Sequence, residues 1–168
     1  MLVEICGLPG TGKSTIAARI ADVRPVVWLR IDAIEGAMWR NGLTPDQTGI
    51  AAYSVAHALA PPHLQRGMTV IADAVSAVEA ARQGWREMAA AAGVPMRVIE
   101  TVCPDEMEHQ RRVLYRKNDL PGFPLPSWAE VQAATAAYEP RIDDRLVLDT
   151  SGDLDGCVRK ALNYLDGH

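Results

Sequence analysis

The sequence has few cysteines and no long hydrophobic run, and both shortages exclude classes of protein. The cysteines are odd in number and widely spaced, at Cys6, Cys103 and Cys157, and no pair has the C-x-x-C spacing. This pattern argues against a disulfide framework or a zinc site and favours buried thiols in a reducing cytosol. No apolar stretch approaches the roughly 20 residues that a membrane helix needs. The first predicted strand follows Met1 almost at once and leaves no room for a targeting peptide, so we expect a cytoplasmic protein without membrane contact.

The sequence also lacks an excess of basic residues. Lysine and arginine number 17 against 21 aspartates and glutamates, which gives a formal net charge of −4. Such a chain is a poor candidate for a nucleic-acid partner, because nucleic acids attract basic surfaces. The histidines His57, His63 and His109 have no metal-ligand spacing and are interpreted as surface or hydrogen-bonded polar groups. A length of 168 residues predicts a single domain over residues 1–168.

One stretch matches the phosphate-binding motif G-x-x-x-x-G-K-[ST] at every fixed position. An apolar run at 2–6 predicts a strand before it, and helical periodicity at 15–21 predicts a helix after it. The glycines allow consecutive backbone N–H groups to surround a phosphate chain at the helix N-terminus. Lys13 can reach the terminal phosphates, and the Ser14 hydroxyl can bind Mg²⁺; the alternative is a glycine-rich turn without a ligand. The expected nucleotide-binding residues of this loop are Gly7, Leu8, Pro9, Gly10, Thr11, Gly12, Lys13, Ser14 and Thr15.

Strands and helices are predicted to alternate along the chain, which indicates an α/β domain with a parallel sheet covered on both faces. The apolar runs predict strands at 2–6, 26–31, 68–72, 95–102 and 145–149. The helical patterns cover 15–21, 33–41, 46–60, 78–92, 105–117, 128–138 and 153–166. Two consecutive prolines, Pro61 and Pro62, are expected to end or kink the preceding helix before Gly67.

Aspartates end three of the predicted strands, at Asp32, Asp73 and Asp149, and ligands of parallel sheets collect at the carboxyl ends of strands. Asp32 is a candidate general base for an acceptor hydroxyl, and the alternative is an N-cap of the helix predicted from Ala33. Asp73 ends an apolar strand and is a candidate Mg²⁺ ligand together with Ser14, with helix capping again as the alternative. Ala74 stands where many P-loop hydrolases have a water-activating glutamate, which favours phosphoryl transfer over hydrolysis.

Four cations lie within seven residues next to a loop rich in proline and glycine. On a helix, Arg112 and Arg116 are i, i+4 neighbours. They could belong to a mobile lid that closes over the phosphates and supplies charge to the transferred phosphoryl group. The alternative is a solvated helix face paired with nearby carboxylates, namely Asp105, Glu106 and Glu108.

Together, these residues resemble the P-loop small-molecule kinases, the group of shikimate kinase, gluconate kinase, chloramphenicol phosphotransferase and the zeta-toxin kinases. The resemblance implies a three-layer α/β/α P-loop fold like that of the nucleoside-monophosphate kinases. Its five-stranded parallel sheet would have the order 2-3-1-4-5, with a short helical lid at about 104–126, and ATP and Mg²⁺ would be the cofactors. Lys13, Asp32, Arg112 and Arg116 would be the catalytic residues, with Asp32 activating the acceptor. The loop bordering the adenine would be Thr150, Ser151, Gly152 and Asp153.

The resulting prediction is an ATP- and Mg²⁺-dependent phosphotransferase that acts on a hydroxyl of a small molecule, such as a sugar, a nucleoside or an antibiotic. One alternative is a P-loop ATPase or nucleotide-binding switch, and another is a polynucleotide 5′-kinase. A GTPase would carry N-K-x-D, which residues 116–119 do not supply. No second acceptor-binding signature accompanies Asp32, so the sequence leaves the acceptor and the oligomeric state open.

Overall fold

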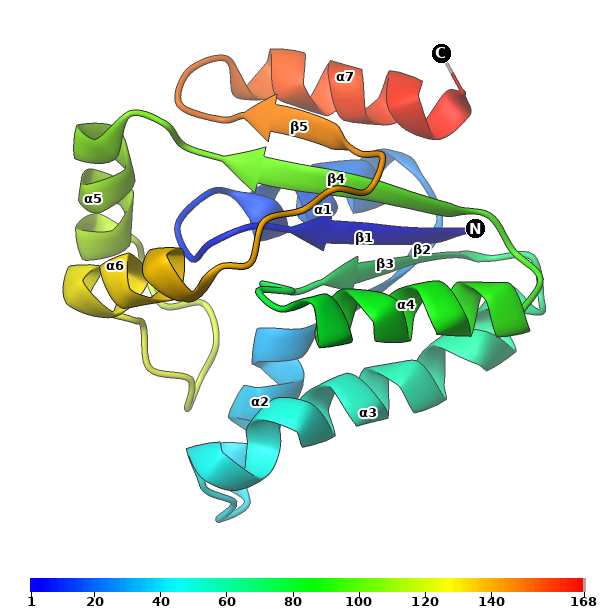
Figure 1. Cartoon of the computed structure of the whole chain (residues 1–168), viewed down its shortest axis with the longest axis horizontal. Helices are drawn as coiled ribbons and strands as arrows, with labels where there is room; N and C mark the ends of the chain where they lie inside the picture. The colour runs from blue at the N-terminus through cyan, green and yellow to red at the C-terminus, as the bar shows by residue number, and fades with distance from the viewer. Residues whose placement is uncertain (168) are drawn as a thin grey trace.

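The computed structural model describes residues 1–167, in which one parallel sheet lies between two layers of helices (Figure 1). The strands are β1 (Leu2–Cys6), β2 (Val26–Arg30), β3 (Thr69–Asp73), β4 (Met96–Val102) and β5 (Leu146–Asp149). Their order is β2-β3-β1-β4-β5, and every neighbouring pair is parallel. The predicted three-layer fold and sheet order are therefore confirmed.

The helices are α1 (Lys13–Val23), α2 (Ile31–Arg40), α3 (Pro45–Leu64), α4 (Glu79–Ala91), α5 (Glu106–Tyr115), α6 (Trp128–Ala137) and α7 (Leu154–Asp166). Helices α1 and α7 cover one face of the sheet and α3 and α4 the other, while α5 and α6 lie beyond the carboxyl ends of the strands (Figure 1). Successive strand residues point to opposite faces, so Val3 and Ile5 pack with α1 and α7 while Leu2 packs with α3 and α4. Because both faces are covered, the strands are mostly apolar, with Glu4 in β1 and Glu100 in β4 as buried exceptions.

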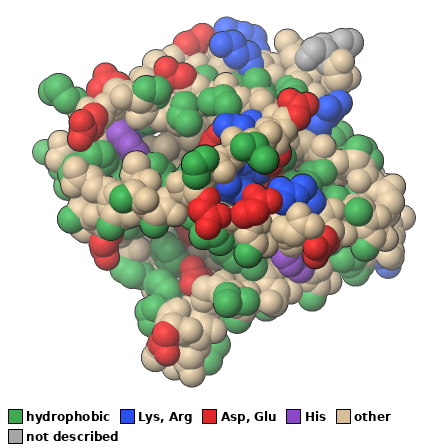
Figure 2. Space-filling model, viewed as in Figure 1, with side chains coloured by type: hydrophobic (Ala, Val, Ile, Leu, Met, Phe, Trp, Pro, Cys, Tyr) green, Lys and Arg blue, Asp and Glu red, His purple; other side chains and the backbone are tan. Residues whose placement is uncertain are grey.

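Next to β1 and β4, a coil rather than a helix covers part of the sheet, and it carries charges. Arg141 donates to the buried Glu4 carboxylate at 2.8 Å and to Asp143 at 2.6 Å. Arg145 donates to Glu100 at 2.6 Å. Figure 2 shows red and blue side chains gathered near the centre of this face, over the coil between α6 and β5. We call Glu4, Glu100, Arg141, Asp143 and Arg145 the charge cluster.

Several element boundaries differ from the sequence prediction, among them the ends of α3 and α5. Helix α3 continues through Pro61 and Pro62 and ends at Leu64, so it ends before Gly67 as expected, but four residues beyond the predicted bound at residue 60. The last turn persists because Leu64 is buried and the Gln65 N–H still bonds to the Pro61 carbonyl. Helix α5 ends at Tyr115, not at residue 117.

The cysteine prediction is confirmed for the described residues, in which all three thiols are free and buried. Burial raises the pKa of Cys6 to about 12, and the nearby carboxylate of Glu4 adds to the rise. A thiol with this pKa stays protonated at neutral pH and is unreactive. Among residues 1–167, no helix combines the length and the apolar character that crossing a membrane requires.

Candidate active site

The phosphate-binding loop needs its glycines for conformation and for space. Gly7, Gly10 and Gly12 have φ angles of 132°, 84° and 90°, which side chains with a Cβ rarely adopt. A Cβ on Gly7 would also lie 2.3 Å from the Thr101 carbonyl oxygen. Gly12 is the N-cap of α1, so the loop leads directly into the helix N-terminus. This backbone geometry is suited to binding an anion.

Lys13 lies folded back along the loop that it follows. Its Nζ donates to the Leu8 carbonyl at 3.1 Å, and the Thr11 hydroxyl donates to the same carbonyl at 2.8 Å. Burial lowers the pKa of Lys13, while the carboxylates of Asp73 and Asp32 oppose that effect. The ammonium group is therefore held in place before any phosphate binds.

Two further contacts hold the loop from outside. His109 of α5 donates from Nε2 to the Pro9 carbonyl at 2.8 Å, and its ring packs edge-on against Trp128. The Thr150 hydroxyl, just after β5, donates to the Thr11 carbonyl at 2.8 Å. His109 is thus a hydrogen-bonded polar group, as the sequence interpretation had it, but its partner in the loop was not foreseen.

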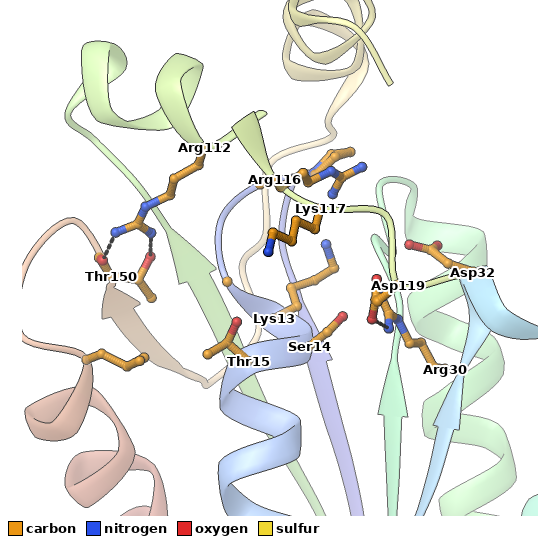
Figure 3. Close-up of a pocket in the computed structure, with 14 residues that line it drawn as sticks. Lys13, Ser14, Thr15, Arg30, Asp32, Arg112, Arg116, Lys117, Asp119 and Thr150 are labelled. Atoms are coloured by element: carbon orange, nitrogen blue, oxygen red, sulfur yellow. Dashed lines mark hydrogen bonds and ion pairs between the residues drawn. The ribbon is translucent and has the colours of Figure 1, made fainter. Parts of the chain in front are cut away.

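A cleft of about 410 Å³ opens over this loop (Figure 3). Figure 3 shows Arg112 and Thr150 at one end of the cleft and Asp32 at the other, with Lys13, Arg116 and Lys117 between them. The lining residues are Pro9, Gly10, Gly12, Lys13, Ser14, Thr15, Arg30, Asp32, Arg112, Arg116, Lys117, Asp119, Thr150 and Leu154.

Asp32 lies in the first turn of α2 and does not cap that helix. The helix begins at Ile31 and its N-cap is Arg30, so the alternative interpretation of Asp32 as a cap of a helix from Ala33 is wrong. Its half-buried carboxylate lines the cleft. No hydrogen bond or salt bridge to it occurs among the described residues. Asp32 is thus a carboxylate with free acceptor capacity near the phosphate loop.

Asp73 has the opposite surroundings. It is 2% exposed, accepts a hydrogen bond from Trp28 Nε1 at 3.2 Å and lies 4.0 Å from Arg30 Nε. Burial raises its pKa, and Lys13 and the Ser14 hydroxyl act against that rise. Helix α4 begins only at Glu79 with Val78 as N-cap, so the capping alternative for Asp73 is wrong.

The oxygen atoms of Ser14 and Asp73 fit Mg²⁺, which prefers oxygen ligands. No group of three or more acidic, cysteine or histidine side chains that could hold a metal occurs in residues 1–167. A magnesium ion here would take its other ligands from phosphate oxygens and water, as is usual for Mg²⁺ at nucleotide sites. The donor set therefore suits a metal that arrives with a nucleotide.

The arginines of α5 have separate positions. Arg112 donates to Thr150, at 3.1 Å to the hydroxyl and 2.6 Å to the carbonyl, and to Glu108 at 2.7 Å. Arg116 lies beyond the helix in an extended conformation, so the expected i, i+4 helical pair does not form. Its buried Nε has no hydrogen-bond partner among the described residues, and burial lowers its pKa. Arg111 is exposed and pairs with Glu108, as the solvated-face alternative expects.

The sequence analysis missed Arg30 and Asp119, which line the cleft together with Lys117, one of the four cations predicted for the lid. Arg30, the last residue of β2, donates to the Asp119 carboxylate at 2.5 and 3.3 Å. This pairing links the chain after α5, which ends at Tyr115, to the carboxyl end of β2. A polar residue at the carboxyl end of a predicted strand was the available signal for Arg30.

The nucleotide-binding residues predicted from the sequence do not all line this cleft. In the loop after β5, Thr150 lines it, but Ser151, Gly152 and Asp153 do not, and Asp153 instead caps α7 by accepting from the Gly156 N–H. Leu154 lines the cleft in their place. In the phosphate loop, three residues line a second cavity on the other side: Gly7, Leu8 and Thr11.

Comparisons with known proteins agree with this geometry. A family model described as AAA domain matches residues 2–140. A curated relative from Aeropyrum pernix, named as a probable adenylyl-sulfate kinase, is 27% identical over an alignment 168 positions long. The alignment covers 91% of this chain and 85% of that protein.

Solved structures share the fold. The structure of Chaetomium thermophilum Kti12 in complex with ADP-AlF3 has a TM-score of 0.74 at 19% identity, covering 99% of this chain and 98% of that one. A gluconokinase from Sinorhizobium meliloti has a TM-score of 0.66 at 19% identity, covering 99% and 97%. Likeness at this level of identity establishes the architecture alone. Since the family model matches most of its length, the chain belongs to the AAA domain family.

Proposed function

We propose that the protein is an ATP- and Mg²⁺-dependent phosphotransferase that moves the γ-phosphate of ATP to a hydroxyl of a small molecule. The observation that carries this proposal is the Asp32 carboxylate, which lines the same cleft as Lys13 and has no hydrogen-bond partner among the described residues. A carboxylate with free acceptor capacity can take the proton of an incoming hydroxyl. Ala74 follows Asp73 and offers no carboxylate for activating water.

In this mechanism, the acceptor hydroxyl lies between Asp32 and the γ-phosphorus. Its oxygen forms a bond to phosphorus while the bond from phosphorus to the β–γ bridging oxygen breaks, and ADP leaves with that electron pair. Asp32 accepts the hydroxyl proton. Lys13 and Arg116 stabilise the negative charge on the transferred group, since fixed cations in a site shielded from water lower the barrier most. Bound Mg²⁺, held through Ser14 and Asp73, would neutralise phosphate charge.

Residues 104–126 are proposed as the lid of this enzyme. Several contacts join the end of this segment to α2 and β2: Phe123 stacks on Trp39 with ring centroids 5.0 Å apart, and Arg30 pairs with Asp119. Arg112, next to Thr150, would lie at the adenine end of the nucleotide, and Arg116 would lie at the phosphates. A closed lid excludes water and so favours transfer over hydrolysis.

The identity of the acceptor is the open part of the proposal. A screen of hydroxyl-bearing metabolites and antibiotics for ADP formation, with an acceptor-free reaction beside each, tests it directly. We expect ADP formation to depend on one class of acceptor and to be lost in Lys13→Ala. ADP formation at the same rate in every reaction, acceptor present or not, would instead identify an ATPase.

A further inference from the structure

A second cavity, of about 650 Å³, lies on the other side of the phosphate loop. It is bounded by the loop, the carboxyl end of β4, α5 and α6, and it shares no lining residue with the nucleotide cleft. Gly7, Leu8 and Thr11 face this cavity, whereas Pro9, Gly10 and the start of α1 face the cleft. The phosphate-binding loop therefore separates the nucleotide cleft from this second cavity. The volume is typical of small-molecule sites, which range from about 300 to 1,000 Å³.

The walls of this cavity differ in chemistry from those of the cleft. Apolar surface comes from Leu8, Val102 and Trp128. Glu100 and Glu106 also line the cavity, but no lysine or arginine among the described residues does. Glu100 is already bonded to Arg145 and to the Tyr138 hydroxyl, at 2.6 and 3.1 Å. An anion placed here would be desolvated without a cationic partner, which is costly.

The cavity is also connected to the loop that would hold the phosphates. The Thr11 and Thr101 hydroxyls, which both line the cavity, are 2.8 Å apart. His109 lines the cavity too and donates to the Pro9 carbonyl on the nucleotide side. The Leu8 carbonyl accepts from Lys13 Nζ. A molecule in contact with Leu8 and His109 would therefore act on the groups that fix the loop and Lys13.

We propose that this cavity is a second ligand site, separate from the nucleotide cleft, for an uncharged or cationic molecule with an apolar ring. Its occupancy changes nucleotide affinity through Leu8, Thr11 and His109. The aromatic face of Trp128 suits a ring or an ammonium group. This inference does not depend on the proposed kinase activity, because it concerns binding alone.

The test uses three probes with one ring and different polar groups: 2-phenylethylamine, 2-phenylethanol and phenylacetate. Binding is followed by NMR on the Trp128 indole N–H of protein labelled with ¹⁵N-tryptophan, with Trp128→Phe used to assign the signal. We expect the amine and the alcohol to bind. Phenylacetate should bind at least about tenfold more weakly, because its carboxylate would lie near Glu100 and Glu106, and no lysine or arginine lines the cavity among the described residues. Saturating ADP and Mg²⁺ should change the affinity for the amine by about threefold or more, since coupling between sites is reciprocal.

Two variants on α6 locate the site. Ala136 is exposed and lines the cavity, so Ala136→Phe should block probe binding. Ala133 is exposed on the same helix but does not line the cavity, so Ala133→Phe should bind the probes as the wild type does. No binding of the amine or the alcohol, equal binding of phenylacetate, or undiminished binding to Ala136→Phe would overturn the site. Equal affinity with and without ADP would overturn the coupling, and phosphorylation of 2-phenylethanol by ATP would make the cavity an acceptor site instead.

Discussion

At the scale of single residues, the two candidate site aspartates have surroundings that separate their roles: Asp32 lines the cleft, and Asp73 does not. Asp73 is buried and bonded to Trp28, and burial raises its pKa, with Lys13 opposing that rise. Asp32 is half-buried and carries no hydrogen bond or salt bridge within the described part of the chain. A general base must accept a proton and release it again, and a partly exposed carboxylate with free acceptor capacity, such as Asp32, suits that role.

Replacing Asp32 by asparagine tests its role as general base. We expect turnover in Asp32→Asn to fall about 100-fold or more, the usual size of a general-base contribution. Nucleotide affinity and thermal stability should remain close to wild type, because the substitution preserves shape and Asp32 does not cap α2. ADP-forming rate, ADP affinity and Tm are measured on the same preparation. A lower Tm with unchanged turnover would assign Asp32 a structural role.

Arg116 and Arg111 form a natural pair for testing the lid cations. Arg116 lines the cleft with an unpartnered buried Nε among the described residues, whereas Arg111 is exposed and paired with Glu108. Arg116→Ala should lower kcat by at least about tenfold, since a cation that contacts the transferred phosphoryl group stabilises mainly the transition state. Arg111→Ala should leave kcat unchanged, as exposed ion pairs contribute little. Similar kcat values for the two variants would remove Arg116 from the mechanism.

At the scale of elements, the prolines of α3 show how a helix can include residues that lie outside its predicted bounds of 46–60. Pro45 is the first residue of α3, where its missing N–H would have no intrahelical partner. Pro61 and Pro62 lie in the last turn, where each removes a donor. Helical periodicity predicted an end at residue 60, because a local pattern does not include the burial of Leu64 in the core. Tertiary packing therefore overrides a local signal in this helix.

The same helix allows a stability prediction with an internal control. Pro62 is exposed, so Pro62→Ala removes a helix-breaking ring without disturbing the core. We expect the free energy of unfolding to rise by about 1–2 kcal/mol. Alanine favours the helix more than proline does, and part of this gain is offset because the unfolded chain has more conformational entropy without the proline ring. Pro45→Ala should instead lower it slightly, by less than about 1 kcal/mol. Urea unfolding measures both, and a loss of stability in Pro62→Ala would contradict our account of the last turn.

At the scale of the whole molecule, the order of the strands could be predicted because the loop motif fixes one strand and its helix. The resemblance that starts from Gly7–Thr15 then gives the sheet order. The lining of the cleft by Arg30 and Asp119 could not be predicted in this way. Their pairing joins residues 89 positions apart in the sequence, and no local pattern encodes such a contact. The charge cluster was missed for the same reason.

The charge cluster gives the last prediction, which concerns how the coil before β5 is attached to the sheet. Arg141 and Glu4 are 1% and 0% exposed at their side chains and 2.8 Å apart. Removing one partner leaves a buried charge, so Arg141→Met should lower the free energy of unfolding by about 3–5 kcal/mol. The double variant Glu4→Leu with Arg141→Met should recover much of that loss, because neither charge then remains. Arg159, in an exposed pair with Asp153, is the control, and Arg159→Met should change stability by less than about 0.5 kcal/mol. If urea unfolding gave the same loss for the double variant as for Arg141→Met, packing of the arginine stem rather than its charge would hold this coil in place.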